Sequence, residues 1–197
     1  MIDYFSKIPE RSAILVIGPP LSQKDKIFYE IVSKALNNKK TVLFITTDHF
    51  PKDVESSLQK NKILPEKYEK EGNLKFIDCY SAQTQNTVSD TAVIKRVPGP
   101  LALNEISVAL AELENYFYKK NKKQYVFFQS LSTLLMYSTP EAVGRFVQII
   151  TARTKNVDGS IVFIIEKGMH DEKVVASMEH LMDGVVEVDG RKVKVKI

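Results

Sequence analysis

The sequence predicts a single α/β domain over residues 1–197, built on a mostly parallel sheet with helices on both faces. Short apolar runs rich in β-branched residues alternate with longer stretches of helical periodicity, which is the pattern of strands joined by crossover helices. The length of 197 residues and the hydrophobic content of 44% allow one domain to bury its own core.

The expected strands are runs of Ile, Val, Phe and Leu without polar alternation, which fits strands that are covered on both faces. They span residues 13–17, 41–46, 74–78, 125–128, 161–165 and 185–188. Asp189 and Gly190 form a hairpin turn signal, so residues 191–197 are expected to return as an antiparallel edge strand.

Three crossover helices are predicted by apolar residues that recur at helical spacing over 27–36, 106–117 and 143–150. Pro140 suits the first turn of the third helix, with Ser138 or Thr139 as its cap. Residues 81–100 are instead rich in Ser, Thr, Gln and Asn, and they predict a long loop of the kind that is often functional.

Composition argues against several classes of protein. No apolar run approaches the roughly 20 residues that span a bilayer, and the first residues lack a secretory signal pattern, so we expect a cytoplasmic protein without membrane insertion. The net charge of +4 comes mostly from dispersed lysines, apart from Lys119, Lys120, Lys122 and Lys123. This cluster fits a solvated helix end better than a nucleic-acid surface. The single cysteine, Cys79, is expected to pack in the core.

The segment after the first expected strand has the position and length of a Walker A phosphate-binding loop. Against the pattern G-x-x-x-x-G-K-[ST], it keeps Gly18 and Lys24. Gln23 replaces the glycine that lets the backbone approach phosphates, and Asp25 replaces the hydroxyl that binds magnesium. A carboxylate can bind a cation, but it repels a triphosphate, and at a helix start it also stabilises the helix by about 0.3–1 kcal/mol. The candidate cofactor-binding positions in this loop are Gly18, Pro20, Ser22, Gln23, Lys24 and Asp25.

Sequence blocks along nearly the whole chain follow the order found in one family of ATPases. They are IPERSAILVIGPP at 8–20, FIDCYS at 76–81, LNEIS at 103–107, VFFQSLS at 126–132, EKGMHD at 166–171 and HLMDGVV at 180–186. These blocks resemble the KaiC-like branch of the RecA-superfamily P-loop ATPases. The resemblance implies a three-layer RecA-like P-loop fold with a C-terminal antiparallel hairpin, and it implies that the Walker A and Walker B motifs are degenerate here.

The resemblance also assigns roles to positions outside the loop. Gln129 stands where the family has the Walker B aspartate of the magnesium shell, and an amide brings no charge to a cation but can hydrogen-bond Lys24 or a loop N–H. Asp48 matches the carboxylate that positions the attacking water, one methylene shorter, but its place before Pro51 fits an ordinary turn and cap residue better. Lys194 and Lys196 match basic residues that reach a neighbouring subunit in related hexamers, and alternating lysines also protect an edge strand from aggregation.

Three functions are compatible with these residues. The first is a non-catalytic regulatory, signal-transducing or assembly module with weak or lost nucleotide binding, because Gln23, Asp25 and Gln129 change separate parts of the phosphoryl-transfer site. The alternative is a divergent ATP-binding protein or ATPase, in which Lys24 holds ATP, Asp25 takes the metal and Asp48 positions water. The second alternative, a nucleic-acid-binding RecA relative, rests on fold and net charge alone.

A protein partner or self-association is the expected form of interaction. The candidate partner surface combines residues 81–100 with residues 168–171, because both should lie at the carboxyl edge of the sheet, where α/β proteins bind ligands. Arg96 is the residue in that surface whose replacement should alter complex formation. The three histidines are too scattered to indicate a metal site, so no metal is assigned, and ATP is the one candidate cofactor.

Overall fold

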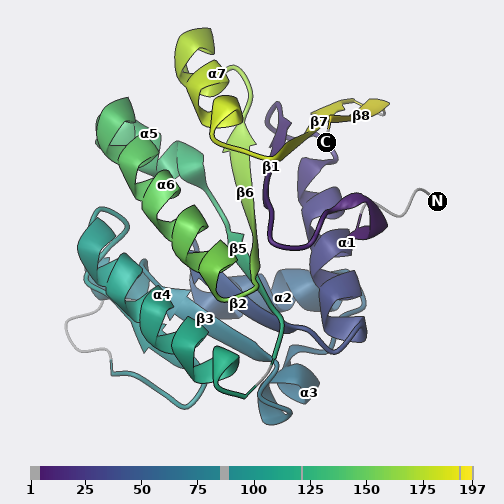
Figure 1. Cartoon of the computed structure of the whole chain (residues 1–197), viewed down its shortest axis with the longest axis vertical. Coiled ribbons are helices and arrows are strands. Elements are labelled where there is room, and N and C mark those ends of the chain that lie inside the picture. The colour runs from purple at the N-terminus through teal and green to yellow at the C-terminus, as the bar shows by residue number, and fades with distance from the viewer. Residues whose placement is uncertain (1–4, 85–88, 121, 191, 197) are drawn as a thin grey trace.

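The computed structural model describes residues 5–84, 89–120, 122–190 and 192–196, in which helices flank an eight-stranded sheet (Figure 1). The strands are β1 Ala13–Gly18, β2 Thr41–Thr46, β3 Leu74–Asp78, β4 Ile94–Arg96, β5 Gln124–Phe128, β6 Ser160–Glu166, β7 Gly184–Asp189 and β8 Lys192–Lys196. Their order in the sheet is β4-β3-β2-β5-β6-β1-β7-β8, and every pairing is parallel except that of β7 with β8.

The helices of the described residues follow the strands as crossover connections. They are α1 Lys24–Asn37, α2 Pro51–Lys60, α3 Pro65–Lys70, α4 Leu103–Tyr118, α5 Leu131–Tyr137, α6 Pro140–Asn156 and α7 Glu172–His180, with short 3-10 helices at Phe5–Lys7 and Ser81–Gln83. The N-terminus of α6 shows how local sequence determines where a helix begins. Thr139 caps it by accepting a hydrogen bond from the Ala142 N–H at 3.2 Å, and Pro140 follows in the first turn, which confirms the predicted cap.

Two hydrophobic cores lie on opposite faces of the sheet, because successive side chains of a strand point in opposite directions. In β1, Leu15 and Ile17 pack with α4, α5 and α6, whereas Ile14 and Val16 pack with α1, α2 and α3. Figure 1 shows α4, α5 and α6 together on one side of the sheet and α1 on the other. The three-layer arrangement and the continuous apolar strands are therefore confirmed.

The C-terminal hairpin is also confirmed over its described residues. β8 pairs antiparallel with β7 after Gly190, which has φ 56°, while residues 191 and 197 of the predicted strand lie outside the described residues. Lys194 and Lys196 are exposed on β8, and Val193 and Val195 pack against the core. Cys79 is fully buried, as expected.

The prediction that residues 81–100 form one long loop was wrong for two described parts of the segment, while its residues 85–88 lie outside the described residues. A 3-10 helix occupies Ser81–Gln83, and β4 adds an edge strand that pairs with β3 from Phe76↔Ile94 to Asp78↔Arg96. β4 has only three residues, all partly buried, so it lacks the apolar run that identifies the longer strands.

Candidate functional site

The loop between β1 and α1 is held in a tight turn. The Ser22 N–H donates to the Pro19 carbonyl at 3.2 Å, and Leu21, which is fully exposed, adopts a positive φ of 61°. A Cβ at Gly18 would lie 2.7 Å from Ser22 Oγ and 2.8 Å from the Val188 carbonyl oxygen, so the close packing of loop and sheet requires glycine there. Gln23 precedes α1 and makes no side-chain cap hydrogen bond.

Lys24, the first residue of α1, is buried, with 2% of its surface exposed. Its Nζ lies 2.8 Å from Glu166 Oε1 and 3.5 Å from Asp25 Oδ2. Glu166 ends β6, and it reaches Lys24 because β6 is the parallel neighbour of β1 and Gly18 is in register with Glu166. The ammonium of Lys24 is thus neutralised by carboxylates of the same chain.

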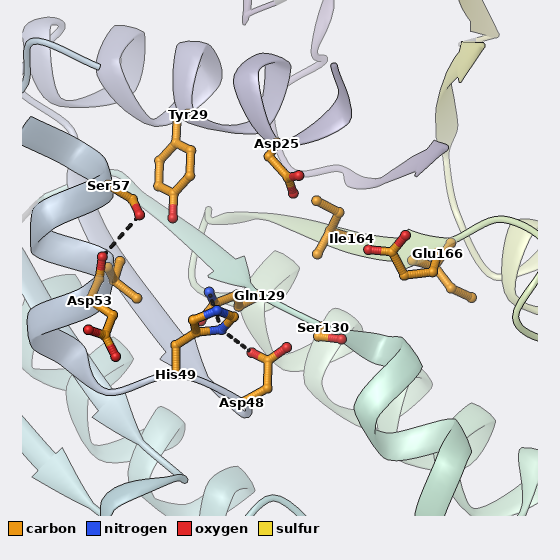
Figure 2. Close-up of a pocket in the computed structure, with 12 residues that line it drawn as sticks. Asp25, Tyr29, Asp48, His49, Asp53, Ser57, Gln129, Ser130, Ile164 and Glu166 are labelled. Carbon is orange, nitrogen blue, oxygen red and sulfur yellow. Dashed lines mark hydrogen bonds and ion pairs between the residues drawn. The ribbon is translucent and has the colours of Figure 1, made fainter. Parts of the chain in front are cut away.

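A polar cavity of about 340 Å³ opens beside this ion pair, at the carboxyl ends of β2, β5 and β6 (Figure 2). Its polar walls come from α1, from the β2–α2 segment and from the ends of β5 and β6. They include Asp25, Tyr29, Asp48, His49, Gln129 and Glu166. We call this cavity the acidic pocket, because Asp53 of α2 adds a fourth carboxylate to those of Asp25, Asp48 and Glu166.

The acidic pocket brings together three of the predicted site residues: Asp25, Asp48 and Gln129. Gly18 at the end of β1 and Pro20, Ser22 and Gln23 in the loop that follows are not among the residues that line it, and Lys24 meets it through the Glu166 carboxylate. The two lysines of β8 are not among the residues that line it.

The sequence suggested that Gln129 hydrogen-bonds Lys24 or a loop N–H, and the structure shows a different contact. Its Nε2 lies 3.3 Å from His49 Nδ1, and the same ring nitrogen lies 2.9 Å from Asp48 Oδ1. The hydrogen bond to Asp48 raises the pKa of His49, with smaller contributions from the charges of Asp48, Asp53 and Asp25 and against the opposing effect of burial. Asp48, the candidate for positioning a catalytic water, therefore acts here as the partner of an imidazole.

Burial dominates the chemistry of the Tyr29 phenol on the α1 wall of the acidic pocket. Desolvation raises the pKa of Tyr29 to about 12, opposed by a hydrogen bond to Ser57 and assisted by the negative charges of Asp25 and Asp48. Tyr29 is accordingly a neutral hydrogen-bonding group at any physiological pH, and it is not a candidate acid or base.

Two acceptor atoms of the acidic pocket have no partner among the described residues. They are Glu166 Oε2 and Gln129 Oε1, and each is buried within a residue that lines the cavity. In the described part of the chain, no group of three or more His, Cys, Asp or Glu side chains is arranged to hold a metal ion. The pocket therefore presents acceptors and negative charge, which suit a ligand that brings hydrogen-bond donors.

A second concavity of about 720 Å³ lies at the same edge of the sheet. We call it the apolar groove. It is formed by residues that follow β2, β3, β4 and β5, among them Tyr80, Pro98, Leu101, Met136 and Tyr137. Asp48 lines both the acidic pocket and the apolar groove, so the two cavities adjoin.

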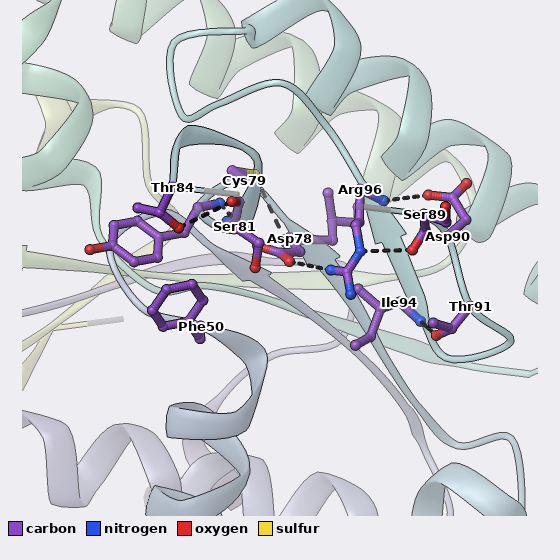
Figure 3. A network of polar contacts seen from close by, with 12 residues as sticks. Phe50, Asp78, Cys79, Ser81, Thr84, Ser89, Asp90, Thr91, Ile94 and Arg96 are labelled. Atoms are coloured by element: carbon purple, nitrogen blue, oxygen red, sulfur yellow. Dashed lines mark hydrogen bonds and ion pairs between the residues drawn. The ribbon is translucent and has the colours of Figure 1, made fainter. Parts of the chain in front are cut away.

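The wall of the groove that follows β3 and β4 is anchored by a buried ion pair (Figure 3). Asp78 is fully buried and receives the Arg96 guanidinium through Nη1 at 2.6 Å, while the N–H groups of Tyr80 and Ser81 donate to its other oxygen at 3.0 Å. Arg96 also donates from Nε to the Ser89 carbonyl at 2.7 Å. The Arg96 guanidinium is therefore engaged within the chain, with 20% of its side chain exposed, and its expected role in complex formation stays a prediction.

The predicted partner surface is divided by the fold. Residues 98–100 of the segment 81–100 line the apolar groove, together with Gln83. None of the described residues lining either cavity comes from 168–171, which connects β6 to α7.

Comparison with known proteins places the chain in a family. The sequence model of the Family of unknown function (DUF7504) matches residues 11–188. The chain belongs to this family. The match runs from the residues before β1 into β7, so the phosphate-loop position and both cavities belong to the part that DUF7504 describes.

Curated relatives of this DUF7504 chain are archaeal UPF0273 proteins. One from Saccharolobus solfataricus is 25% identical over 189 residues, and one from Pyrobaculum aerophilum is 23% identical over 188 residues. Each alignment covers 94% of this chain but 64% of the relative, so the chain spans a little under two thirds of the length of the curated relatives it matches.

Two solved structures share the fold. An uncharacterized protein of Pyrococcus horikoshii, crystallised in complex with an unknown peptide, superposes with a TM-score of 0.75 at 18% identity and covers 98% of this chain and 84% of that one. The flagellar accessory protein FlaH of Methanocaldococcus jannaschii gives 0.68 at 16% identity and covers 95% and 77%. These likenesses confirm the predicted RecA-like fold of the DUF7504 chain.

Sequence reasoning located the loop but missed the residues that surround Lys24 and Gln129. Glu166 and His49 carry the two decisive contacts of the pocket, and each lies just at or after the carboxyl end of a strand. Their position after apolar runs was the available signal, because parallel strands bring such residues to one edge. The periodicity of the sequence does not reveal the strand order that makes them neighbours.

In the described part of the chain, no helix is long and apolar enough to cross a membrane.

Proposed function

We propose that this chain is a cytoplasmic, non-catalytic regulatory or assembly module that uses its RecA-like fold to bind a protein partner, with vestigial Walker A and Walker B positions. The observation that carries the proposal is the ion pair between Lys24 and Glu166 at 2.8 Å, in which the lysine is almost fully buried.

Glu166 holds the Lys24 ammonium, which is the cation that a phosphate-binding loop needs to contact its ligand. In a working loop, the lysine reaches the β- and γ-phosphates. To do so here, Lys24 would have to leave Glu166 and Asp25, and two carboxylates would remain beside the incoming triphosphate. Lys24 would exchange a carboxylate partner for phosphate, and the carboxylates left behind would repel the ligand.

The groups that would handle magnesium and water are engaged elsewhere. Asp48 pairs with His49, and Gln129 contacts the same imidazole. Phosphoryl transfer depends almost wholly on the positioning of such groups and on their charge, so these contacts favour a function without turnover.

A protein ligand is favoured by two observations. The Pyrococcus horikoshii protein of the same fold was crystallised with an unknown peptide. In this chain, the apolar groove at the carboxyl edge of the sheet is lined by exposed Leu101, Met136 and Tyr137, and an exposed apolar surface of this kind is a feature of protein-binding sites.

The proposal is tested by calorimetric titration of the chain with ATP, with and without magnesium. We expect no binding heat at millimolar ATP under either condition. Magnesium-dependent binding that disappears in Lys24→Ala would overturn the proposal and support a divergent ATPase, for which turnover would be the next assay.

A second variant keeps this test interpretable. Lys24→Ala leaves Glu166 without its partner and can unfold the chain, whereas Lys24→Met combined with Glu166→Gln removes both charges together. The double variant should fold and should bind ATP no better than the wild type. The single variant Glu166→Gln releases Lys24 from its partner. We expect this variant alone to gain ATP binding, because the ion pair no longer keeps Lys24 from the phosphates.

A further inference from the structure

The apolar groove has the size and composition of a ligand site. Its volume of about 720 Å³ lies within the roughly 300–1,000 Å³ that small-ligand pockets occupy. Leu101, Met136 and Tyr137 on its walls expose 49%, 55% and 65% of their surface. Leu101 precedes α4 and the other two end α5, so the fold brings side chains from two separate segments to the same groove.

The groove is held open by contacts that do not depend on a ligand. The Asp78–Arg96 ion pair (Figure 3) fixes the segment that carries Tyr80. The Tyr80 ring packs edge-on against Phe50 at 4.9 Å between centroids. On the opposite wall, Ser130 caps α5 by accepting a hydrogen bond from the Thr133 N–H at 3.1 Å. A preformed groove loses less conformational entropy when it binds than a mobile one.

The groove continues into the acidic pocket. Asp48 lines both, and Ser130 of the pocket is hydrogen-bonded to Thr133 of the groove. Asp48 therefore lies at the boundary of the two cavities, and a ligand that fills the groove can place a side chain beside this carboxylate.

The acidic pocket selects for a cation with several donors. It carries four carboxylates, of which those of Glu166 and Asp25 share Lys24 and that of Asp48 pairs with His49. Glu166 Oε2 and Gln129 Oε1 are buried acceptors without a partner in the described residues. Guanidinium and ammonium groups carry a positive charge and offer only donors, so a cation of this kind complements the carboxylates that line the pocket.

We infer that the apolar groove and the acidic pocket together form a docking site for a segment of a partner protein that carries a large apolar side chain next to an arginine or lysine. The apolar side chain lies between Leu101 and Tyr137, and the cation enters past Asp48 toward Glu166. This inference rests on the proposed function, since it names the chemistry of the protein partner. The carboxylates that attract such a segment repel nucleic acid.

The site is tested by NMR titration of the isotope-labelled chain with synthetic peptides on a glycine–serine background. The first peptide carries adjacent leucines followed by arginine, the second replaces the arginine with glutamate, and the third replaces the leucines with serine. We expect the first to shift the amides of Gly99, Leu101 and Ala102 and those of residues 133–137 and 48–49, with each replacement weakening binding about tenfold or more. Equal shifts from all three peptides, or none from the first, would overturn the inference.

Matched variants separate the two parts of the site. Tyr137→Ser and Asp48→Asn should each weaken the first peptide, and Asp48→Asn should also reduce its preference over the glutamate peptide. Val108→Ser on α4 and Glu172→Gln on α7 remove the same kinds of exposed group away from the site, and they should leave binding unchanged. Binding that survives Tyr137→Ser and Asp48→Asn would place the peptide elsewhere.

The failure of this inference is distinguishable from the failure of the proposed function. Absence of peptide binding together with absence of ATP binding would remove the docking site and leave the non-catalytic module. Magnesium-dependent ATP binding would overturn the proposed function whatever the peptides do.

Discussion

Replacing Glu114 with glutamine should change how the stability of the chain depends on pH. Glu114 lies on α4 with none of its surface exposed, and Thr154 donates a hydrogen bond to its Oε1 at 2.5 Å. Its Oε2 has no partner among the described residues. Desolvation is the largest effect on this carboxyl, and it raises the pKa of Glu114 from 4.5 to about 7 despite the Thr154 hydrogen bond and the charge of Arg153.

The sign of the effect follows from proton binding. Between pH 4.5 and about 7 the folded chain keeps the Glu114 proton while the unfolded chain releases it, so the free energy of unfolding falls as the pH rises through this interval. With about 1.4 kcal/mol for each pH unit, the total loss is about 3 kcal/mol, and it is complete above pH 7. Glutamine mimics the protonated carboxyl, so Glu114→Gln should equal the wild type near pH 4.5 and exceed it by up to about 3 kcal/mol at pH 8.

The assay is urea denaturation of both proteins across this pH range, compared as the difference between the two free energies of unfolding. Titration of His49 and of other carboxyls is common to both proteins and cancels in that difference. Glu105→Gln, an exposed site on the same helix, should show no such pH-dependent gain. Parallel wild-type and Glu114→Gln curves from pH 4.5 to 8 would refute the reasoning.

Three further predictions concern the walls of the site. Arg96→Ala should lower the free energy of unfolding by about 3 kcal/mol or more in urea denaturation, because it leaves the buried Asp78 carboxylate without its counter-ion; a loss below about 1 kcal/mol would contradict this role. Gly18→Ala should be destabilising by about 1–3 kcal/mol through overpacking, whereas Gly99→Ala, whose Cβ would meet nothing closer than 3.7 Å, should stay within about 0.5 kcal/mol; similar losses would argue against the close approach at the loop. The affinity of the leucine–arginine peptide should rise with pH through a midpoint above 6.5, because His49, whose pKa is raised, loses its positive charge over this range. An affinity that does not depend on pH would contradict the placement of the peptide cation beside Asp48 and His49.

The fold was predictable because each of its long strands is a continuous apolar run. β1, β2, β5 and β6 are buried over nearly their whole length, and buried parallel strands of this kind are identifiable without knowing their neighbours. β4 escaped prediction because an edge strand of three residues, held by the Arg96 side chain as well as by its backbone, leaves no apolar pattern.

The site was predictable only in part, for a related reason. The loop at Gly18–Asp25 could be found because its residues are consecutive and follow a strand. The partner of Lys24 could not, because Glu166 is more than a hundred residues away and reaches it only through the adjacency of β1 and β6. In the same way, Gln129 was placed correctly at a strand end, but its contact with His49 depends on β5 lying beside β2.

The central claim is that Glu166 holds Lys24 and keeps it from a nucleotide. It is tested most directly by NMR of the Lys24 ammonium group, assigned by its disappearance in the folded Lys24→Met, Glu166→Gln double variant. The account predicts that the Lys24 signal is unchanged by millimolar magnesium–ATP and moves in Glu166→Gln, where its partner is lost. A Lys24 signal that shifts on addition of magnesium–ATP in the wild type would show that the lysine leaves Glu166 for phosphate, and it would contradict the account.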